Sequence, residues 1–559
     1  MSDITQLADE LVAARFEAYP FECSLLGLDG PHHRLADFSE QARQRIKDQV
    51  LAVARAATEV PPARLGAADR ITRELIVQQA CAIAAEIEVR LEEFSFSDGL
   101  SAPALWPLVA LPIIKLTDVS MAEGYLARLE AIPEYLATVA ERQRIGLAHG
   151  LAAPDFLVRA GIAYVDRYLA SYRRDPLRSV VPTVRVAGFS ERRDTLVEEK
   201  VRPAYARYRM FLATEIEPHA RPEGQAGLWW QPDGDNRYAA LIGVHTTTAH
   251  SPLQLHDMGR ALIEQLAQEY AVLGARVFGT RDLPAIFHRL RHDPALRWSS
   301  GAEIVDSARQ AITRAEAVAR RWFGRLPQER VEVAPVPDTE AEGGTAAYYM
   351  APSLDGSRPG TYFANISDPK SRCRHSAEAI AFHEAIPGHH LQITTALGLK
   401  TLPLLRRIAD INAYDEGWGL YAERLADEMG LYSSDLARLG MLAQDSMRAA
   451  RLVVDTGLHG FGWSRQRAVE YLTEHTPMAP VEIDAEVDRY CAVPAQALSY
   501  MVGRLEIQRI RSAAERALGR RFDIRRFHDV ILGGGPLPMS ILDTVVREWV
   551  DEQFAVPVR

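Results

Sequence analysis

The fold of this chain is best approached from the stretch Phe382-His383-Glu384-Ala385-Ile386-Pro387-Gly388-His389-His390-Leu391-Gln392. It begins with a His-Glu pair, and two more histidines follow six and seven residues after the first. In a His-Glu signature whose second histidine lies one helical turn on, both histidines bind Zn²⁺ and the glutamate is a general base. Here the residue four positions after His383 is Pro387, so the strict pattern is interrupted.

Pro387 and Gly388 offer a way to restore that geometry. On a straight helix His383 and His389 point about 120° apart, because each residue turns about 100°. Proline disfavours a straight helix and glycine can adopt the dihedral angles of a break. A bulge that absorbs two residues would bring His389 to the place of the usual second histidine. His390 would lie on the face of His383 but about 10 Å along the helix. We expect His389 as the second ligand and His390 beside the metal or facing substrate, with the choice between the two still open.

Composition and charge limit the class of protein. The chain has 559 residues, of which 47% are hydrophobic and 25% charged, enough for a large core in two or three domains or one large helical fold. A net charge of −10 argues against a nucleic-acid partner. The four scattered cysteines indicate free thiols in a reducing compartment.

Neither the N-terminus nor the most apolar stretch predicts a membrane partner. The residues from Met1 to Gln6 lack the basic flank and apolar core of a secretory signal. The stretch from Ala104 to Leu116 is too short to span a bilayer. We therefore expect a soluble, cytoplasmic protein.

Hydrophobic periodicity predicts a mainly α-helical fold with one small sheet. Residues 1–223 form an N-terminal helical region, and residues 224–559 form a catalytic region that completes the same unit. The Gly-, Pro- and Trp-rich loop from Gly224 to Asn236 is the expected boundary, and Ser251 with Pro252 is a helix start. Short alternating or aromatic runs at 331–336, 346–350 and 361–366 predict the sheet, with a turn at 355–360. The metal-site helices are expected over 376–428, with Ser376 as a cap.

A second helix, around residues 412–423, carries two acidic candidates. Glu416 and Glu423 are seven residues apart and share a face beside Leu420. A zinc site with two histidines needs a third ligand, and a glutamate from a following helix is one solution. We expect Glu416 to be that ligand and Glu423 to orient a ligand histidine. The alternative is that both are surface acids.

Several residues further along the chain are candidates for substrate contacts. Arg451, Asp455 and His459 recur every four residues on one helical face. They form either an intrahelical ion pair with a satisfied histidine, or Arg451 or His459 clamps a substrate carboxylate or carbonyl. Tyr500 lies on an otherwise apolar helix, where its hydroxyl either donates to a tetrahedral oxyanion or is satisfied at the edge of the core. Arg489 is a weaker candidate of the same kind.

The chain resembles the domain-of-unknown-function 885 (DUF885) family, bacterial proteins grouped with His-Glu-type zinc metallopeptidases. The matching stretches are 355–360, which includes Arg358, then 383–389, 416–418, 451–459, 494–500 and 527–535. The resemblance implies a multi-helical zinc-metallopeptidase-like fold with a deep cleft between lobes. It also implies His383, His389 and Glu416 as ligands and Glu384 as base. Arg358 is kept as a substrate-binding candidate. Many relatives look exported, whereas this chain lacks a signal.

These observations predict a zinc hydrolase that holds one Zn²⁺ per chain and cleaves peptide or other amide bonds with Glu384 as general base. One alternative is a non-catalytic protein that binds a peptide or small ligand; another is an amidase or esterase for a small metabolite. Mn²⁺ or Co²⁺ in place of Zn²⁺, the length of the substrate and a homodimeric state all stay open.

Overall fold

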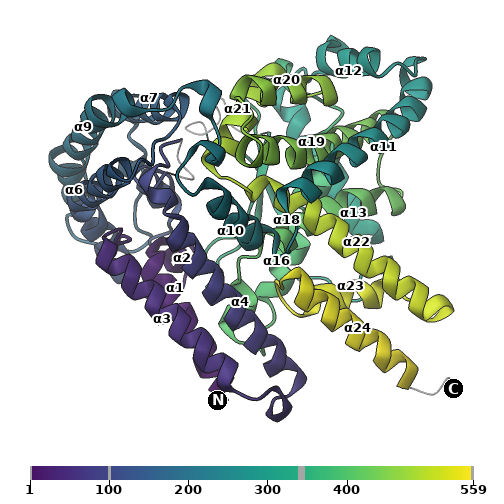
Figure 1. The fold of residues 1–559 in the computed structure, drawn as a ribbon, viewed down its shortest axis with the longest axis horizontal. Helices are drawn as coiled ribbons and strands as arrows, with labels where there is room; N and C mark the ends of the chain where they lie inside the picture. Colours follow the sequence, from purple (N-terminus) through teal and green to yellow (C-terminus); the bar gives the residue numbers. More distant parts are fainter. Residues whose placement is uncertain (1–2, 98–101, 338–345, 556–559) are drawn as a thin grey trace.

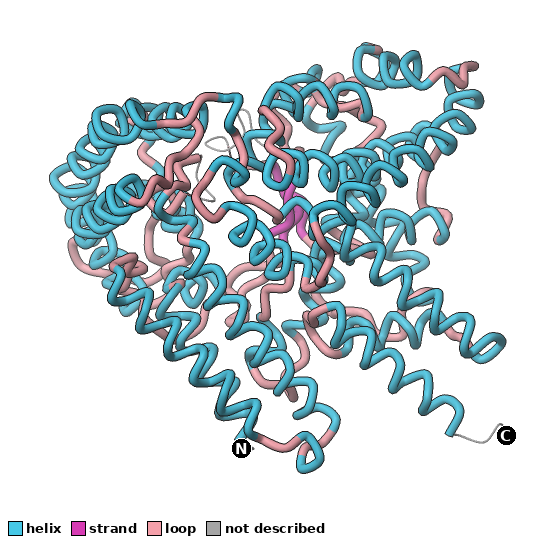
Figure 2. Tube along the Cα trace, in the orientation of Figure 1, coloured by secondary structure: helices cyan, strands magenta, loops and turns pink. Residues whose placement is uncertain are grey.

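The computed structural model describes residues 3–97, 102–337 and 346–555, so Met1 and Ser2 of the N-terminal segment lie outside it. Within these residues the fold is mainly α-helical, as predicted, and one small three-stranded sheet lies near the middle of the molecule (Figure 2). No helix of the described residues combines the length and the apolar character needed to cross a membrane.

The N-terminal helices gather on one side of the molecule (Figure 1). α3 and α4 pack along each other, and α1 packs against both. The helices of this part are α1 (Asp3–Ala18), α2 (Pro20–Leu25), α3 (Glu40–Glu59), α4 (Ala67–Val89), α5 (Trp106–Ile113), α6 (Val119–Ala148), α7 (Asp155–Ala170), α8 (Phe189–Leu196) and α9 (Arg202–Phe211).

The helices that follow build the centre and the opposite side. α10, α16 and α18 lie centrally in Figure 1, and α11 packs along α19. This part consists of α10 (Gly234–Thr246), α11 (Pro252–Phe278), α12 (Leu283–His292), α13 (Gly301–Val318), α15 (Ala377–Glu384), α16 (His389–Leu397), α17 (Leu404–Ile408), α18 (Asn412–Glu428), α19 (Asp435–Gly460), α20 (Arg465–His475), α21 (Pro480–Ala492), α22 (Ser499–Leu518), α23 (Ile524–Gly533) and α24 (Met539–Ala555). The predicted start at Ser251 is confirmed, because Ser251 and Gln254 form a capping box at α11.

The predicted small sheet is mixed and has three strands in the described residues, two of them the expected strands at 346–350 and 361–366. β1 (Glu332–Pro335) pairs in parallel with β3 (Thr361–Ala364), and β2 (Ala347–Met350) pairs with β3 in the antiparallel direction. The strand order is β1-β3-β2, so β2 lies at an edge. β2 contacts α15 and α13 contacts the other two strands, so the sheet adjoins the helix that ends at Glu384.

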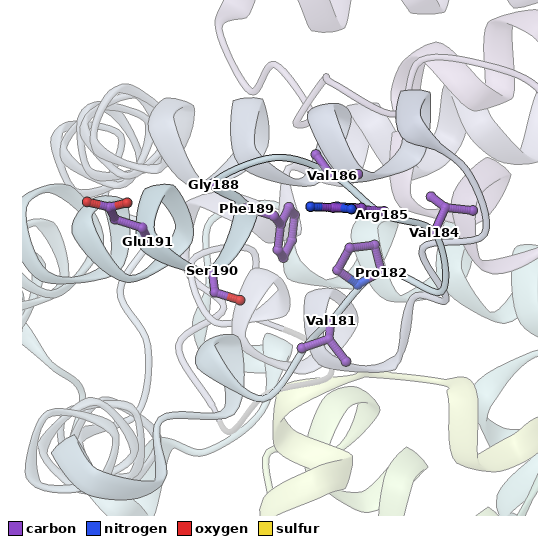
Figure 3. A pocket seen from close by; sticks show the side chains of 9 residues that line it. All are labelled: Val181, Pro182, Val184, Arg185, Val186, Gly188, Phe189, Ser190 and Glu191. Carbon is purple, nitrogen blue, oxygen red and sulfur yellow. The ribbon is translucent and has the colours of Figure 1, made fainter.

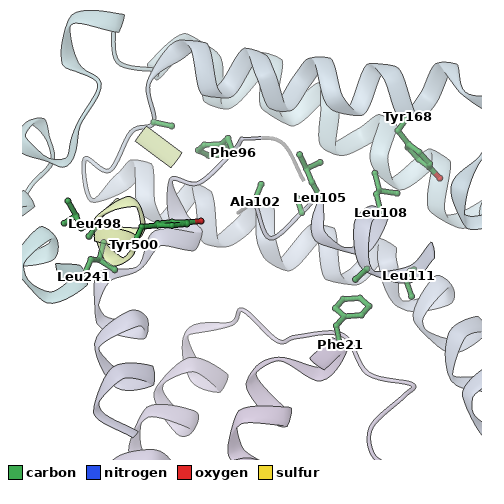
Figure 4. Close-up of a cluster of buried hydrophobic side chains, with 14 of the residues drawn as sticks. Phe21, Phe96, Ala102, Leu105, Leu108, Leu111, Tyr168, Leu241, Leu498 and Tyr500 are labelled. Carbon is green, nitrogen blue, oxygen red and sulfur yellow. The ribbon is translucent and has the colours of Figure 1, made fainter. Parts of the chain in front are cut away.

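Hydrophobic clusters run through both sequence regions. One joins Phe21 and Leu108 of the N-terminal helices to Leu498 and Tyr500 (Figure 4). Another joins α1, α3 and α4 to apolar residues of α18 and α22–α24. The expected boundary holds two short 3₁₀ turns, Glu223–Gln225 and Leu228–Trp230, before α10 begins. The division at residue 223 stays a prediction.

Candidate metal centre

The His-Glu stretch forms two helices separated by a break. α15 ends at Glu384 and α16 begins at His389, and the connection includes a cis Ile386–Pro387 bond. We predicted a bulge inside one helix, and that detail is wrong. A side chain at position 388 would place its Cβ 1.8 Å from the carbonyl oxygen of His383, so the backbone turns back on itself there and only glycine fits. The indole Nε1 of Trp418 donates to the Pro387 carbonyl at 2.9 Å and so anchors the break to α18.

The break nevertheless brings His389 to His383. Their ring centres are 4.7 Å apart and the ring planes are nearly perpendicular, at 89°. Glu416 Oε2 lies 3.5 Å from His383 Nε2 and 3.4 Å from His389 Nε2. One ligand atom from each of the three residues lies within 4.8 Å of the others. Ligand atoms bound at about 2.0–2.2 Å to one zinc ion are roughly 3–4 Å apart, so this donor set fits a zinc ion.

Glu423 fixes the orientation of His383. Its Oε1 lies 2.8 Å from His383 Nδ1, and its side chain is fully buried. With Nδ1–H donating to Glu423, Nε2 faces Glu416 and is the ring nitrogen that would bind a metal, in exchange for its proton. Gly419 makes room for the ring, since a Cβ there would lie 2.6 Å from His383 Cε1. The α18 backbone and Glu423 together set the position of one ligand.

The charges of the cluster shift its pKa values in opposite directions. Burial would lower the pKa of His383, but hydrogen bonds to Glu416 and Glu423 raise it to about 10. Burial would raise the pKa of Glu416, but its hydrogen bonds to His383 and His389 hold that pKa well below its usual value. Burial raises the pKa of Glu384, against the opposing charges of the two histidines. A carboxylate with a raised pKa suits a group that takes up a proton at neutral pH.

Glu384 is the acid of this group that has no partner. Its side chain is half-buried, and it makes no hydrogen bond or ion pair with another residue of the described chain. The charges of His383, His389 and Glu416 all act on it, as does that of Arg448. Tyr362 of β3 is near enough for the charge of Glu384 to add to burial in raising the pKa of the tyrosine hydroxyl. Glu384 therefore keeps its lone pairs available beside the donor set.

Tyr500 lies next to the donor set, at the start of α22. Its ring centre is 6.4 Å from that of His383 and nearly parallel to it, at 21°. The ring also belongs to the hydrophobic cluster in Figure 4. Arg489 Nη2 donates to the Tyr500 hydroxyl at 3.2 Å, and the guanidinium carbon of Arg451 lies 4.5 Å from the ring centre. The structure thus brings Tyr500, Arg451 and Arg489 together beside the histidines.

His390 does not join the donor set. Its Nδ1 is 2.9 Å from the Tyr349 hydroxyl and its Nε2 is 3.0 Å from the Glu329 carbonyl oxygen. Both ring nitrogens therefore have protein partners, on β2 and on the segment before β1. Of the two histidines, His389 is the one that lies with His383 and Glu416 in a group that could hold a metal, so we keep His389 as the expected ligand.

Three other candidates make structural contacts away from the donor set. Arg358 donates to the carbonyls of Ala351 and Leu25. Asp455 accepts from the Tyr238 hydroxyl at 2.6 Å and from the Ala495 backbone N–H at 3.1 Å.

The third, His459, accepts from the Leu228 N–H at 2.9 Å, and its Nε2 lies 3.0 Å from the Tyr490 carbonyl. These contacts tie segments together and leave neither ring nitrogen of His459 free for a ligand.

Sequence reasoning missed two residues of the site. Arg448 lies three residues before Arg451 on α19, and a spacing of three on one helical face was the available signal. Gly419 was the other, and the signal was a pair of glycines, at 417 and 419, inside a helical pattern.

The surface hollow in Figure 3, of about 390 Å³, is lined by residues between Val181 and Glu191 and by none of the site residues.

Comparison with known proteins gives one family and a fold. A family model described as "Bacterial protein of unknown function (DUF885)" matches residues 20–546. A solved structure described as a "putative lipoprotein" from Colwellia psychrerythraea has a TM-score of 0.89 at 26% identity, covering 98% of this chain and 99% of that one. A "putative lipoprotein of unknown function" from Shewanella oneidensis has a TM-score of 0.74 at 17% identity, covering 98% and 100%, and shows the fold alone. No curated protein matches.

Proposed function

The chain belongs to the DUF885 family, and we propose that it is a zinc-dependent hydrolase that cleaves amide bonds, peptide bonds first of all. The observation that carries this proposal is the position of Glu384 beside His383, His389 and Glu416. Two imidazoles and one carboxylate leave a zinc ion an open coordination position, which is the arrangement of catalytic zinc sites. A site with a purely structural role has no need of a free carboxylate next to it.

Each residue of the site has a separate role in the proposed reaction. A zinc ion in this site would supply Lewis acidity and lower the pKa of a bound water from about 15.7 to near 7. Glu384, half-buried with a raised pKa, accepts the proton of the attacking water and passes it to the leaving amine. The Tyr500 hydroxyl donates a hydrogen bond to the oxyanion, and a hydrogen bond from Arg489 holds that hydroxyl in place. Glu423 keeps His383 in the ligating tautomer.

The sheet supports a peptide as the substrate. β2 is an edge strand and contacts α15, which ends at Glu384. An extended peptide can add to such an edge through main-chain hydrogen bonds, which hold a substrate of any sequence. A deep cleft leading to this edge, and a fold shared with helical zinc peptidases, are parts of the proposal.

The test is a cleavage assay on the zinc-loaded protein. Wild-type protein is incubated with a peptide library and a panel of small acyl amides, and products are identified by mass spectrometry. We expect cleavage that a chelator stops and zinc restores. Glu384→Gln should keep the metal and lose roughly 10²–10⁴-fold in kcat, the usual contribution of a general base, whereas His383→Ala should lose metal and activity together. Wild-type turnover by Glu384→Gln would show that Glu384 is not the base, and no cleavage of any substrate would overturn the proposal.

A further inference from the structure

We infer that Arg448, Arg451 and Arg489 form a carboxylate-binding subsite around Tyr500, next to the metal centre. The inference rests on the proposed hydrolase function and names its substrate class. The preferred substrates are amides that carry a free carboxylate close to the scissile bond, above all peptides cleaved at their C-terminal residue.

Three guanidinium groups converge on one tyrosine. The guanidinium carbons of Arg451 and Arg448, both on α19, lie 4.5 and 5.7 Å from the centre of the Tyr500 ring. Arg489, on α21, donates to the Tyr500 hydroxyl at 3.2 Å. Like charges held this close in a partly buried site repel each other, so such a cluster needs anions to balance its charge.

The described protein supplies only part of that balance. Glu486 accepts from Arg451 at 2.7 Å and lies 3.7 Å from Arg489, and these charges lower its pKa to about 2. No other carboxylate of the described chain forms an ion pair with any of the three arginines, and Arg448 hydrogen-bonds only the neutral side chain of Gln444. Among the described residues the three positive charges thus share one ion-paired carboxylate, while Glu384 and Asp455 interact with Arg448 and Arg451 through their charges without forming an ion pair.

Two of the arginines also have donors to spare. Nε of Arg448 and Nη1 of Arg451 are buried and have no hydrogen-bond partner among the described residues. The two residues are 8% and 2% exposed, so bulk water does not satisfy these donors freely. An unpaired buried donor costs about 1–3 kcal/mol, and more when it is charged, so these groups favour a ligand that accepts hydrogen bonds. A carboxylate matches the planar fork of a guanidinium.

The spacing suits a carboxylate close to the cleaved bond. Tyr500 is near both groups, because its ring centre is 6.4 Å from that of His383 and 4.5 Å from the guanidinium carbon of Arg451. One residue of extended chain spans about 3.3–3.6 Å and a charge-assisted hydrogen bond adds about 2.7–2.9 Å, so a carboxylate within the next few residues of a substrate held at the histidines would reach the arginines. The Arg489 side chain is 38% exposed, which provides a side from which a ligand can enter.

Structural packing alone accounts for only some of these contacts. Nε and Nη2 of Arg451 bind Glu486, and its Nε also reaches the Tyr490 hydroxyl, which ties α19 to α21. That role leaves Nη1 of Arg451 unused and gives no reason for Arg448 to face Tyr500 with an unpaired Nε.

The test measures binding without turnover. Zinc-loaded Glu384→Gln is titrated calorimetrically with three probes: benzoyl-glycyl-alanine, its C-terminal amide, and benzoyl-glycyl-aspartic acid α-amide, whose only carboxylate is on the side chain. Charge-assisted hydrogen bonds predict that the first probe binds at least about tenfold more tightly than its amide. If the third probe binds as well as the first, the subsite accepts any nearby carboxylate; if it binds like the amide, the subsite reads the C-terminus.

Variants made in the same Glu384→Gln background test whether the arginines cause the tighter binding of the acid probe. Arg448→Met and Arg489→Met should each bring the ratio of the affinities for acid and amide close to one. Because Arg489 is partly exposed, Arg489→Met still tests the subsite if Arg448→Met, at a buried position, does not fold. Arg438→Met is the matched control: Arg438 is on the same helix and pairs with Asp427 and Asp435, so the ratio should not change. Equal affinity for acid and amide, no measurable binding of the acid, or a ratio unchanged in both variants would overturn the subsite.

The two proposals fail in different ways. If wild-type protein cleaves amides but the acid and amide probes bind equally, the hydrolase stands and the subsite falls. If the acid probe binds preferentially but the wild-type protein cleaves nothing, the subsite stands and the hydrolase falls.

Discussion

At the scale of single residues, the orientation of His383 decides whether a metal can bind. Its Nδ1 is held by the buried Glu423 at 2.8 Å and its Nε2 faces Glu416 at 3.5 Å. Gly419 leaves the space that the ring occupies. Because each nitrogen of the ring has its own carboxylate, the ring is held in one orientation, which would lower the cost of binding a metal.

Removing the charge of Glu423 should therefore weaken the metal site without removing a ligand. We expect Glu423→Gln to lower zinc affinity about 10–100-fold, the usual effect of losing a partner of a ligand histidine. Competition with a chromophoric chelator measures this. Glu428→Gln is the control, because Glu428 is on the same helix but pairs with Arg511 at the surface. Equal affinities for Glu423→Gln and wild type would refute the orienting role.

Helical spacing explains which of these residues could be predicted from sequence. Glu416 and Glu423 share a face because seven residues make nearly two turns, and the structure places both beside His383. The contacts of His390 could not be predicted, since Tyr349 and Glu329 reach it from the sheet region. Contacts between residues far apart in sequence leave no local pattern.

At the scale of elements, α18 carries the acidic half of the site and its position depends on α22. The two helices cross closely enough that a Cβ at Gly503 would lie 1.8 Å from the Ala413 carbonyl oxygen, and one at Gly417 would lie 2.5 Å from the Gly503 backbone. Glycine on both helices is what allows this approach. Separating them would move Glu416 and Glu423 away from His383.

A methyl group at this crossing should therefore damage both stability and metal binding. Overpacking of a tight core costs typically about 1–3 kcal/mol, and we expect at least that from Gly503→Ala, together with weaker zinc binding. Gly243→Ala is the matched control: Gly243 lies within α10 with open space around it, so alanine there should be neutral or stabilise by up to about 1 kcal/mol. Chemical denaturation and zinc titration test both variants. A Gly503→Ala protein as stable as Gly243→Ala would contradict the account of this crossing.

The elements themselves were largely predictable, and the exception is instructive. Aromatic runs and turn residues predicted β2 and β3, alternation at 331–336 marked the region of β1, and a Ser-Pro pair predicted the start of α11. The break after Glu384 was expected as a bulge, because Pro387 and Gly388 show that a helix is interrupted but not how the chain re-enters one. The anchor from Trp418 to Pro387, which joins two helices, is a tertiary contact that no periodicity encodes.

At the scale of the whole molecule, buried histidines link folding to pH. His528 is fully buried between the Tyr421 hydroxyl and the Trp322 carbonyl, and burial lowers its pKa to about 3. His459 is buried with a pKa lowered in the same way, also to about 3. The unfolded chain takes up these protons near pH 6.5 and the folded chain does not, so stability falls as the pH drops from about 6.5 towards 3.

Replacing one such histidine should flatten that dependence. Each contributes a slope of up to about 1.4 kcal/mol per pH unit, so the unfolding free energy of His528→Gln should fall less steeply than that of wild type between about pH 6 and 4. Urea unfolding at a series of pH values measures the slope, which is independent of any loss of stability common to all pH values. Parallel curves for the two proteins would show that His528 does not take part.

The most direct test of the metal centre is the metal content of the purified, zinc-supplied protein, measured by elemental analysis in wild type, His389→Ala and His390→Gln. The geometry predicts one zinc per chain in wild type, none in His389→Ala, and one in His390→Gln, because the His390 ring hydrogen-bonds Tyr349 and Glu329 of the described residues and lies outside the donor set. A wild-type protein without zinc, or a His389→Ala protein that keeps it, would contradict the assignment of His383, His389 and Glu416 as the metal site.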